Sequence, residues 1–197
     1  GGKADPDYAS TEKAKLRREL SAIVESSDDA IISVSRDIHI TSWNAGAENI
    51  YGYTPDEVMG CKPDFLVPEH RKNEVSDYLE DVFQDKTIRH FETERLRKDG
   101  QMIHISLSVS PIKDEQDQII GAATIARDIT ERKKSDLALQ ASEEKYRSIF
   151  EYSGDGILLM RETIIDCNRQ AEKIFGYSKE ELIGRHPEEL SPVKQPD

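Results

Sequence analysis

The middle of the chain has the alternating apolar and polar residues of a β-strand with one buried face. Between Met102 and Ile112, Ile, Leu and Val alternate with His and Ser over eight positions, which is the period of a strand. Weaker runs of the same kind predict four further strands, at 30–35, 38–43, 89–97 and 119–127. The Asp99-Gly100 pair favours a tight hairpin turn before the long strand. The pattern predicts two strands early in the chain and three antiparallel strands later.

Apolar residues with helical spacing flank and separate these strands. Leu16, Leu20 and Ile23 recur every three or four residues, as on one face of a helix. The predicted helices cover 10–25, 44–60 (one or two short helices), 68–83 and 131–149. Asp128 stands before the last helix as its expected N-terminal cap. This order of elements predicts an α+β domain whose sheet is covered on one face by helices.

A stretch of twenty residues occurs twice. Residues 44–63 return as residues 168–187 with nine of the twenty positions identical, where composition alone gives roughly one or two. Solenoid repeats have periods of about 20–50 residues, so a spacing of 124 residues indicates tandem domains. The predicted organisation is an N-terminal tail and amphipathic helix over 1–20, a first domain over 21–132, a helical linker over 133–149 and the N-terminal part of a second domain over 150–197.

The second copy ends before the equivalents of the three later strands. Half a sheet has open edges and an uncovered apolar face. We therefore expect residues 150–190 to pack against the first domain or against a neighbouring chain.

Composition narrows the range of partners. The net charge of −12 makes nucleic acid and anionic membranes poor partners. No apolar run approaches the roughly 18 residues of a membrane span, and no signal peptide opens the chain. The only cysteines, Cys61 and Cys167, fit a reducing compartment without a disulfide framework. These features predict a cytoplasmic protein region.

Motifs in a fixed order resemble those of the PAS domains of sensory proteins. The motifs are Asp29-Ala-Ile-Ile32, Ile40-Thr-Ser-Trp-Asn44, Ala47-Glu-Asn-Ile-Tyr-Gly-Tyr53, Glu57-Val-Met-Gly60, Arg97-Lys-Asp-Gly100, Val109-Ser-Pro-Ile112 and Ala126-Arg-Asp-Ile-Thr-Glu-Arg132. The resemblance covers residues 20–132 fully and residues 145–190 as a first half only. It implies the PAS fold, an antiparallel five-stranded sheet of order 2-1-5-4-3 with short helices on one face, here in a tandem PAS/PAC sensor region.

The resemblance also implies a function. PAS modules sense or relay signals in larger proteins, typically sensor histidine kinases or cyclic-dinucleotide enzymes. We expect no enzyme activity here, because the sequence has no Gly-x-Ser-x-Gly, phosphate-binding Gly loop or phospho-accepting His motif. Asp128 and Thr130 resemble the family's Asp-Ile-Thr signature, which implies that they couple the sheet to the outgoing helix. The alternative is that Asp128 only caps that helix.

No flavin, haem or metal is expected. Flavin-binding LOV members of the family carry a reactive Cys where this chain has Pro63, and Cys61 lies two residues too early. Haem-binding members place a His where this chain has Val75, and His70 sits at the expected start of that helix. The histidines show neither an i, i+4 pair nor a nearby Cys-x-x-Cys; they are His39, His70, His90, His104 and His186.

An unidentified small ligand stays open. The last strand is rich in small residues, which leave volume beneath the helices. The candidate lining residues are Ile32, Ile40, Trp43, Phe65, Tyr78, Leu107, Ala122 and Ala126. The alternative is a dry core packed to ordinary density.

The predicted helices 10–25 and 131–149 are candidates for the seam of a homodimer. Leu139, Ser142, Tyr146 and Ile149 have the a/d spacing of a short coiled coil. Fewer than three heptads are present, so a merely amphipathic linker is the alternative. The other expected partners are adjacent signalling domains of the full-length protein. Two functions compete: a ligand-responsive relay, and a ligand-free dimerisation or scaffold module.

Overall fold

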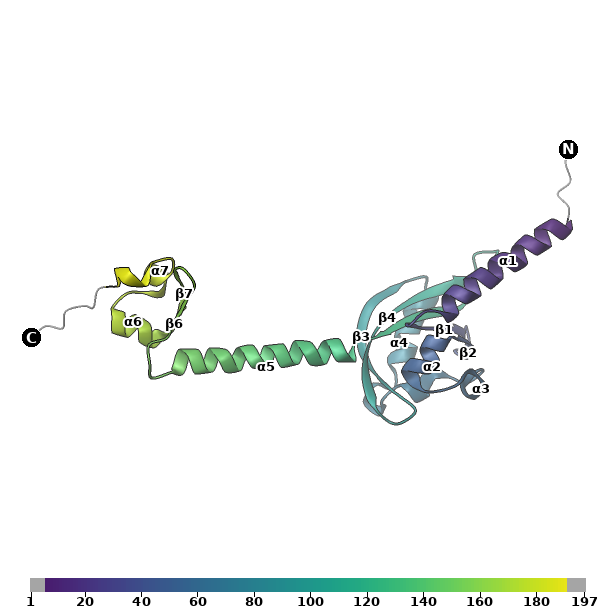
Figure 1. Cartoon of the computed structure of the whole chain (residues 1–197). Coiled ribbons are helices and arrows are strands. Elements are labelled where there is room, and N and C mark those ends of the chain that lie inside the picture. The colour runs from purple at the N-terminus through teal and green to yellow at the C-terminus, as the bar shows by residue number, and fades with distance from the viewer. Residues whose placement is uncertain (1–5, 191–197) are drawn as a thin grey trace, which may run out of the picture. The chain divides into compact units, whose positions relative to one another are not determined.

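The computed structural model describes residues 6–190. The chain divides into two compact units, Gly1–Lys133 and Lys134–Asp197, each with its own hydrophobic core (Figure 1). Residues 1–5 of the predicted N-terminal tail and residues 191–197 of the predicted second domain lie outside the described residues.

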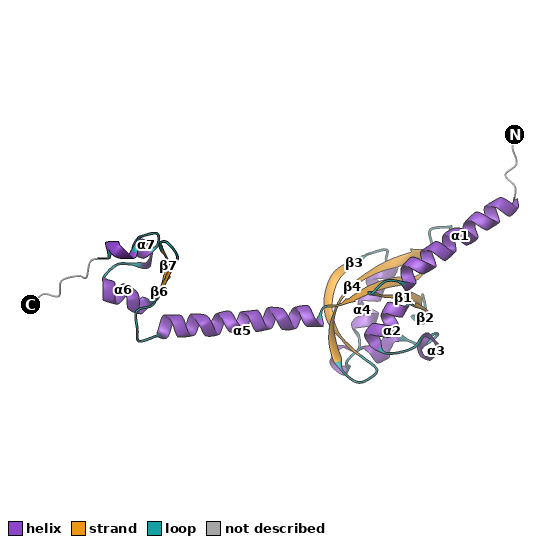
Figure 2. Cartoon of the chain, viewed as in Figure 1, coloured by secondary structure: helices purple, strands orange, loops and turns teal. Residues whose placement is uncertain are grey.

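The first unit contains a long helix, a five-stranded sheet and short helices inserted between the second and third strands (Figure 2). In chain order its elements are α1 (Pro6–Glu25), β1 (Ala30–Ser35), β2 (Ile40–Trp43), α2 (Ala45–Tyr51), α3 (Pro55–Val58), the 3-10 turns η1 (Pro63–Leu66) and η2 (Glu69–Arg71), α4 (Glu74–Phe83), β3 (Ile88–Leu96), β4 (Met102–Lys113) and β5 (Ile119–Asp128). The long helix α5 (Thr130–Tyr152) follows β5 directly.

The helix predicted over 68–83 is shorter than the sequence pattern indicated. Its α-helical part, α4, begins only at Glu74, and η2 precedes it. The physical reason is the apolar stripe, which starts at Val75, while residues 69–74 are all polar or charged. Without apolar residues to bury, that stretch gains no packing energy from a regular helix.

The sheet has the predicted strand order, β2-β1-β5-β4-β3, and every neighbouring pair is antiparallel. The predicted alternation of β4 is confirmed, because its Ile, Leu and Val side chains at 103, 105, 107 and 109 are all buried. The helices α2, α3 and α4 pack on one face of the sheet (Figure 1). The core lies between these two layers.

Side chains at the ends of the short helices define where each helix begins and stops. Asn44 caps α2 by accepting a hydrogen bond from the Ala47 backbone N–H, and Gly52 ends it with a φ of 81°. Only glycine takes that left-handed conformation without steric cost. Thr54 and Glu57 then form a capping box at the start of α3.

The second unit repeats this first half on a smaller scale. After α5 its elements are β6 (Leu158–Met160), β7 (Ile164–Cys167), α6 (Arg169–Phe175), α7 (Lys179–Leu182) and the 3-10 turn η3 (Pro187–Glu189). The caps recur as Asn168 at α6 and a Ser178–Glu181 capping box at α7. Its buried core is small and consists of Ile164, Cys167, Ala171 and Leu182.

Candidate functional site: core cavity, helix junctions and a charged pocket

A small cavity lies in the core of the first unit, between the sheet and the helices. Its volume is about 30 Å³, and its wall consists of Ile32, Val34, Tyr51, Pro63, Leu66, Val75, Tyr78, Leu79, Arg95, Ile105, Leu107 and Thr124. Of the residues predicted to line a cavity, Ile32, Tyr78 and Leu107 are in this wall.

The other predicted lining residues lie elsewhere in the core. Ile40, Trp43, Ala122 and Ala126 are buried but are not part of the cavity wall. Phe65 is half-buried, and its ring packs edge-on against Tyr53 with centroids 4.8 Å apart. On β5 the lining side chain is Thr124, which lies between the two fully buried alanines.

Arg95 is the charged residue of this wall, and it was not among the predicted site residues. It is only 3% exposed. Its Nη1 donates to Oε1 of Glu74 at 2.6 Å and to the Glu94 carbonyl at 2.8 Å, whereas Nη2 is buried without a hydrogen bond to any described residue. The available sequence signal was the spacing of Thr93 and Arg95, which places both on one face of β3.

The partners of Arg95 form a buried polar network. The Thr93 hydroxyl lies 2.9 and 2.8 Å from the two carboxylate oxygens of Glu74. Burial alone raises the pKa of Glu74, but the hydrogen bonds from Arg95 and Thr93 outweigh it, so the pKa lies below its ordinary value. Glu74 therefore stays ionised at neutral pH and holds Arg95 in place.

Two tyrosines of the cavity wall stay protonated. Burial raises the pKa of Tyr51, and the positive charge of Arg95 lowers it only in part. Burial likewise raises the pKa of Tyr78, again against the effect of Arg95. Both phenols therefore remain neutral groups that can donate a hydrogen bond.

The cavity is small compared with known ligand cavities. An engineered cavity of about 150 Å³ binds benzene, and this one is about 30 Å³. Pro63 and Val75, which stand at the family's flavin-Cys and haem-His positions, are both part of its wall. Cys61 is exposed, and His70 lies on η2, where its Nε2 is 3.2 Å from Glu94.

Within residues 6–190 two negative observations concern metals and membranes. No group of three or more His, Cys, Asp or Glu side chains is arranged to hold a metal ion. No helix in that range is both long enough and apolar enough to span a membrane.

The predicted coupling residues lie where the sheet meets α5. The Thr130 backbone N–H donates to Oδ1 of Asp128 at 2.8 Å. Oγ1 of Thr130 accepts from the His104 N–H at 2.9 Å, and the Ile129 N–H donates to the His104 carbonyl at 2.9 Å. Ile129 itself is buried. The start of α5 is therefore fastened to β4 by side-chain and backbone hydrogen bonds.

A second junction, which sequence reasoning did not single out, lies at the other end of α5. Asn168 is fully buried; its Nδ2 donates to the carbonyls of Phe150 (2.8 Å) and Asp155 (2.9 Å). Its Oδ1 accepts from the N–H groups of Ile157 (2.8 Å) and Ala171 (2.9 Å). The last turn of α5 is thus fastened to the strand and the short helix that follow it in the second unit.

Asn44 makes the same four hydrogen bonds in the first unit. Its Nδ2 donates to the carbonyls of Val24 (2.8 Å) and Asp29 (3.1 Å), and its Oδ1 accepts from Ile31 (2.8 Å) and Ala47 (2.9 Å). In both units, therefore, one asparagine joins the incoming helix to the first strand and the first short helix. The signal in the sequence was its place at the start of the repeated stretch.

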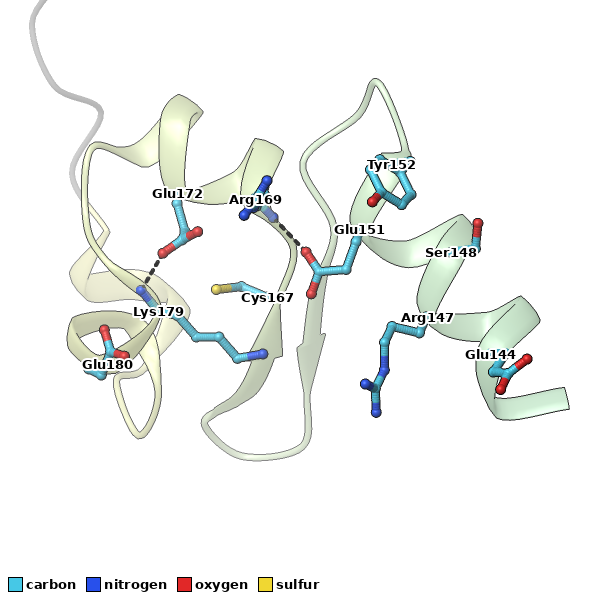
Figure 3. A pocket seen from close by; sticks show the side chains of 10 residues that line it. All are labelled: Glu144, Arg147, Ser148, Glu151, Tyr152, Cys167, Arg169, Glu172, Lys179 and Glu180. Carbon is cyan, nitrogen blue, oxygen red and sulfur yellow. Dashed lines mark hydrogen bonds between the residues drawn. The ribbon is translucent and has the colours of Figure 1, made fainter. Parts of the chain in front are cut away.

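A larger, open pocket lies within the second unit, between the last turns of α5 and the helices α6 and α7 (Figure 3). Its volume is about 600 Å³, and charged side chains dominate its wall: Glu144, Arg147, Ser148, Glu151, Tyr152, Cys167, Arg169, Glu172, Lys179 and Glu180. Many of these charges are engaged with their neighbours. Lys179 Nζ is 2.6 Å from Asp166, and Glu172 accepts a hydrogen bond from the Lys179 N–H at 2.8 Å.

The sequence repeat shows that one residue of this wall is smaller than its counterpart in the first unit. Cys167 occupies the position that Trp43 has in the first unit. There the indole ring packs 5.6 Å from the ring of Tyr51, and its Nε1 donates to the Tyr53 carbonyl at 2.9 Å. Cys167 has no ring to make these contacts; it is buried, and burial raises the pKa of its thiol, so it remains a neutral packing residue.

Comparisons with known proteins agree with this geometry. A family profile described as "PAS fold" matches residues 24–134, and one described as "PAS domain" matches residues 144–197. Neither profile describes a catalytic domain. The crystal structure of the PAS domain of a protein from Colwellia psychrerythraea superposes with a TM-score of 0.55 at 26% identity, covering 59% of this chain and 98% of that one.

Curated relatives include signalling kinases. Sporulation kinase E of Bacillus subtilis is 29% identical over 85% of this chain, and the sensor histidine kinase TmoS of Ectopseudomonas mendocina is 26% identical over 75% of it. The chain spans only 22% and 15% of the lengths of these two relatives. The chain therefore belongs to the PAS family, with two PAS domains in tandem, and is related to sensor kinases.

Proposed function

We propose that this chain is a sensory and relay region of a larger signalling protein, a sensor histidine kinase. A change in the first PAS domain is passed through Asp128, Ile129 and Thr130 into α5, and from α5 to the second PAS domain. The chain itself does no chemistry in this proposal. The two free cysteines fit a cytoplasmic position.

The observation that carries this proposal is that α5 is fastened at both ends. Its first turn is bonded to β4 through Thr130, and its last turn is bonded to the second unit through Asn168. Phe150, near the end of the helix, is also buried. Between these points α5 runs for 23 residues without Gly or Pro, a length of roughly 34 Å. A movement of β4 therefore has a continuous path of hydrogen-bonded structure to the second domain.

We further propose that the chain forms a homodimer through α1 and α5. Apolar side chains on these helices are more than half exposed at Leu16, Leu20 and Ile23 on α1 and at Leu139 and Ile149 on α5. Tyr146, on the same stripe of α5, is half exposed. When two copies of the chain pair along these helices, the stripe on each copy is buried against the same stripe on the other. A ligand-free dimerisation module, or the sensor region of a cyclic-dinucleotide enzyme, are the alternatives.

The relay is tested by removing the bond between Thr130 and β4. In Thr130→Val the side chain keeps its shape but loses the hydroxyl that accepts from His104. We expect faster hydrogen–deuterium exchange in the first turn of α5 and also, by coupling, at Ile157 and Ala171 of the second domain. The measurement is exchange followed by mass spectrometry on the whole chain.

Thr87→Val is the matched control, because Thr87 is exposed in the loop between α4 and β3. It should leave exchange in the second domain unchanged. If Thr130→Val alters exchange only around residues 128–133 and leaves the second domain as it was, the relay is refuted and the dimerisation module becomes the better description.

A further inference from the structure

The cavity of the first PAS domain has one end rich in hydrogen-bond donors. Arg95 lies in its wall almost fully buried, and its Nη2 has no hydrogen-bond acceptor among the described residues. The other side of the guanidinium is satisfied by Glu74 and by the Glu94 carbonyl. A buried, charged N–H without an acceptor is costly. The guanidinium also interacts with the Tyr78 hydroxyl of the wall, but no carboxylate or carbonyl of the described residues accepts a hydrogen bond from Nη2.

The carboxylates near Arg95 are engaged by other groups. Glu74, whose side chain is 13% exposed, is shared between Arg95 and Arg71, which lies 3.1 Å away. The next carboxylate, Glu94, faces the outer side of the network, where it pairs with Arg71 and His70. The two guanidinium groups are thus matched by two carboxylates, and neither carboxylate accepts a hydrogen bond from Nη2 of Arg95.

The other polar groups of the wall point to the same chemistry. They are the hydroxyls of Tyr51, Tyr78 and Thr124, each of which can donate a hydrogen bond. No carboxylate is part of the wall. The remaining wall is aliphatic apart from Arg95, so a species held there meets donors at one end and apolar carbon elsewhere.

The size of the cavity limits what enters. Its volume of about 30 Å³ equals roughly the space of one water in the liquid. We propose that this cavity binds a small monovalent anion, with Nη2 of Arg95 as its principal ligand. The anion is either a free halide or formate, the smallest carboxylate. This gives the proposed sensor a ligand class and rests on that proposed function for its biological meaning.

Thermal unfolding of the whole chain at constant ionic strength tests the proposal. Sodium gluconate, whose anion is too large for the cavity, is replaced stepwise by sodium chloride or by sodium formate. Trp43 is the only tryptophan and is buried in the first domain, so its fluorescence reports the unfolding of that domain alone. We expect Tm to rise by about 5 °C for each tenfold increase in the bound anion above its Kd.

Two variants test whether Arg95 is responsible for the rise in Tm with anion concentration. Arg95→Met alone leaves Glu74 without a main partner and is apt to unfold the domain, so the test variant is Glu74→Gln combined with Arg95→Met. This double variant should lose the anion response. Arg89→Met, at an exposed position of the same strand, should keep it. Bromide soaked into crystals should give an anomalous peak beside Nη2.

The possible results distinguish a halide site from a carboxylate site, and both from a cavity that holds only water. A response to chloride as well as formate identifies a site open to free halide, and a response to formate alone identifies a carboxylate site. Equal Tm in all three salts, or a response that persists in the double variant, overturns the proposal; an ordered water then satisfies Nη2. Neither result alters the exchange test with Thr130→Val, so the relay stands or falls separately.

Discussion

Two asparagines, one at the entrance of each PAS domain, use every hydrogen-bonding capacity of their side chains. Asn44 and Asn168 each donate twice and accept twice, the full capacity of a carboxamide. The neighbouring acid strengthens the same connection, since Glu25 accepts from the Ala45 N–H at 3.1 Å. In each domain one asparagine side chain therefore holds the incoming helix in place. Replacing it leaves the backbone N–H and C=O groups that it bonds without partners.

We expect Asn44→Ala to destabilise the first domain by about 3 kcal/mol, because it removes a helix cap and leaves buried backbone groups without partners. Chemical denaturation followed by Trp43 fluorescence measures this free energy. Asn73→Ala is the control, because Asn73 stands at the N-terminus of α4, is exposed and makes no cap hydrogen bond. Its effect should stay within about 0.5 kcal/mol. Equal effects of the two substitutions would contradict the role given to Asn44.

The sequence predicts apolar faces well and the detail of the cavity poorly. Alternation in β4 correctly predicts which side chains are buried. It does not reveal Arg95, because β3 is polar on both faces and the partner of Arg95, Glu74, comes from α4. Nor does it show that Ala122 and Ala126 are covered rather than open. Both questions are decided by how α4 packs on the sheet, which no local pattern encodes.

At the scale of elements, α5 belongs to both domains. Its first turn follows the last strand of the first PAS domain and is bonded to β4. Its last turn is bonded to Asn168 of the second PAS domain, just as the last turn of α1 is bonded to Asn44 of the first. The sequence predicted this helix over 131–149, and it extends to Thr130–Tyr152. The difference lies at the two ends, where tertiary bonds to His104 and Asn168 support turns that helical periodicity alone does not mark.

The exposed stripe of α5 leads to a prediction about assembly. Replacing Leu139 and Ile149 together by Glu places charges on the proposed seam and should convert a dimer into a monomer, as seen by sedimentation equilibrium. Leu137→Glu is the matched control: Leu137 is as exposed as the other two but lies on the opposite side of the helix. A wild-type chain that is monomeric at high concentration would contradict the proposed dimer.

At the scale of the whole molecule, the two domains differ in the size of their cores. Among residues 6–190, the first domain buries nineteen apolar residues in one cluster, whereas the second buries four. Fewer buried side chains provide less stabilisation against the entropy of the chain. The sequence repeat predicted two related domains, but it did not show how little of the second one is buried.

We therefore expect two separate unfolding transitions in urea. Circular dichroism, which follows the helices of both domains, should show a first transition at a concentration where Trp43 fluorescence is still native. The second should coincide with the fluorescence change. Single, superimposable transitions by both probes would instead show that the domains unfold as one cooperative unit.

The unbroken course of α5 has a consequence for its length. Each residue added to a helix turns its far end by about 100° about the axis, whereas seven residues complete almost two full turns. Because α5 is bonded at its first turn to His104 and at its last turn to Asn168, a residue inserted between these bonds rotates one set of bonding groups against the other about the helix axis. Linkers in related proteins that work in the same way should therefore differ in length by multiples of about seven residues, and a single inserted residue should disturb signalling more than seven.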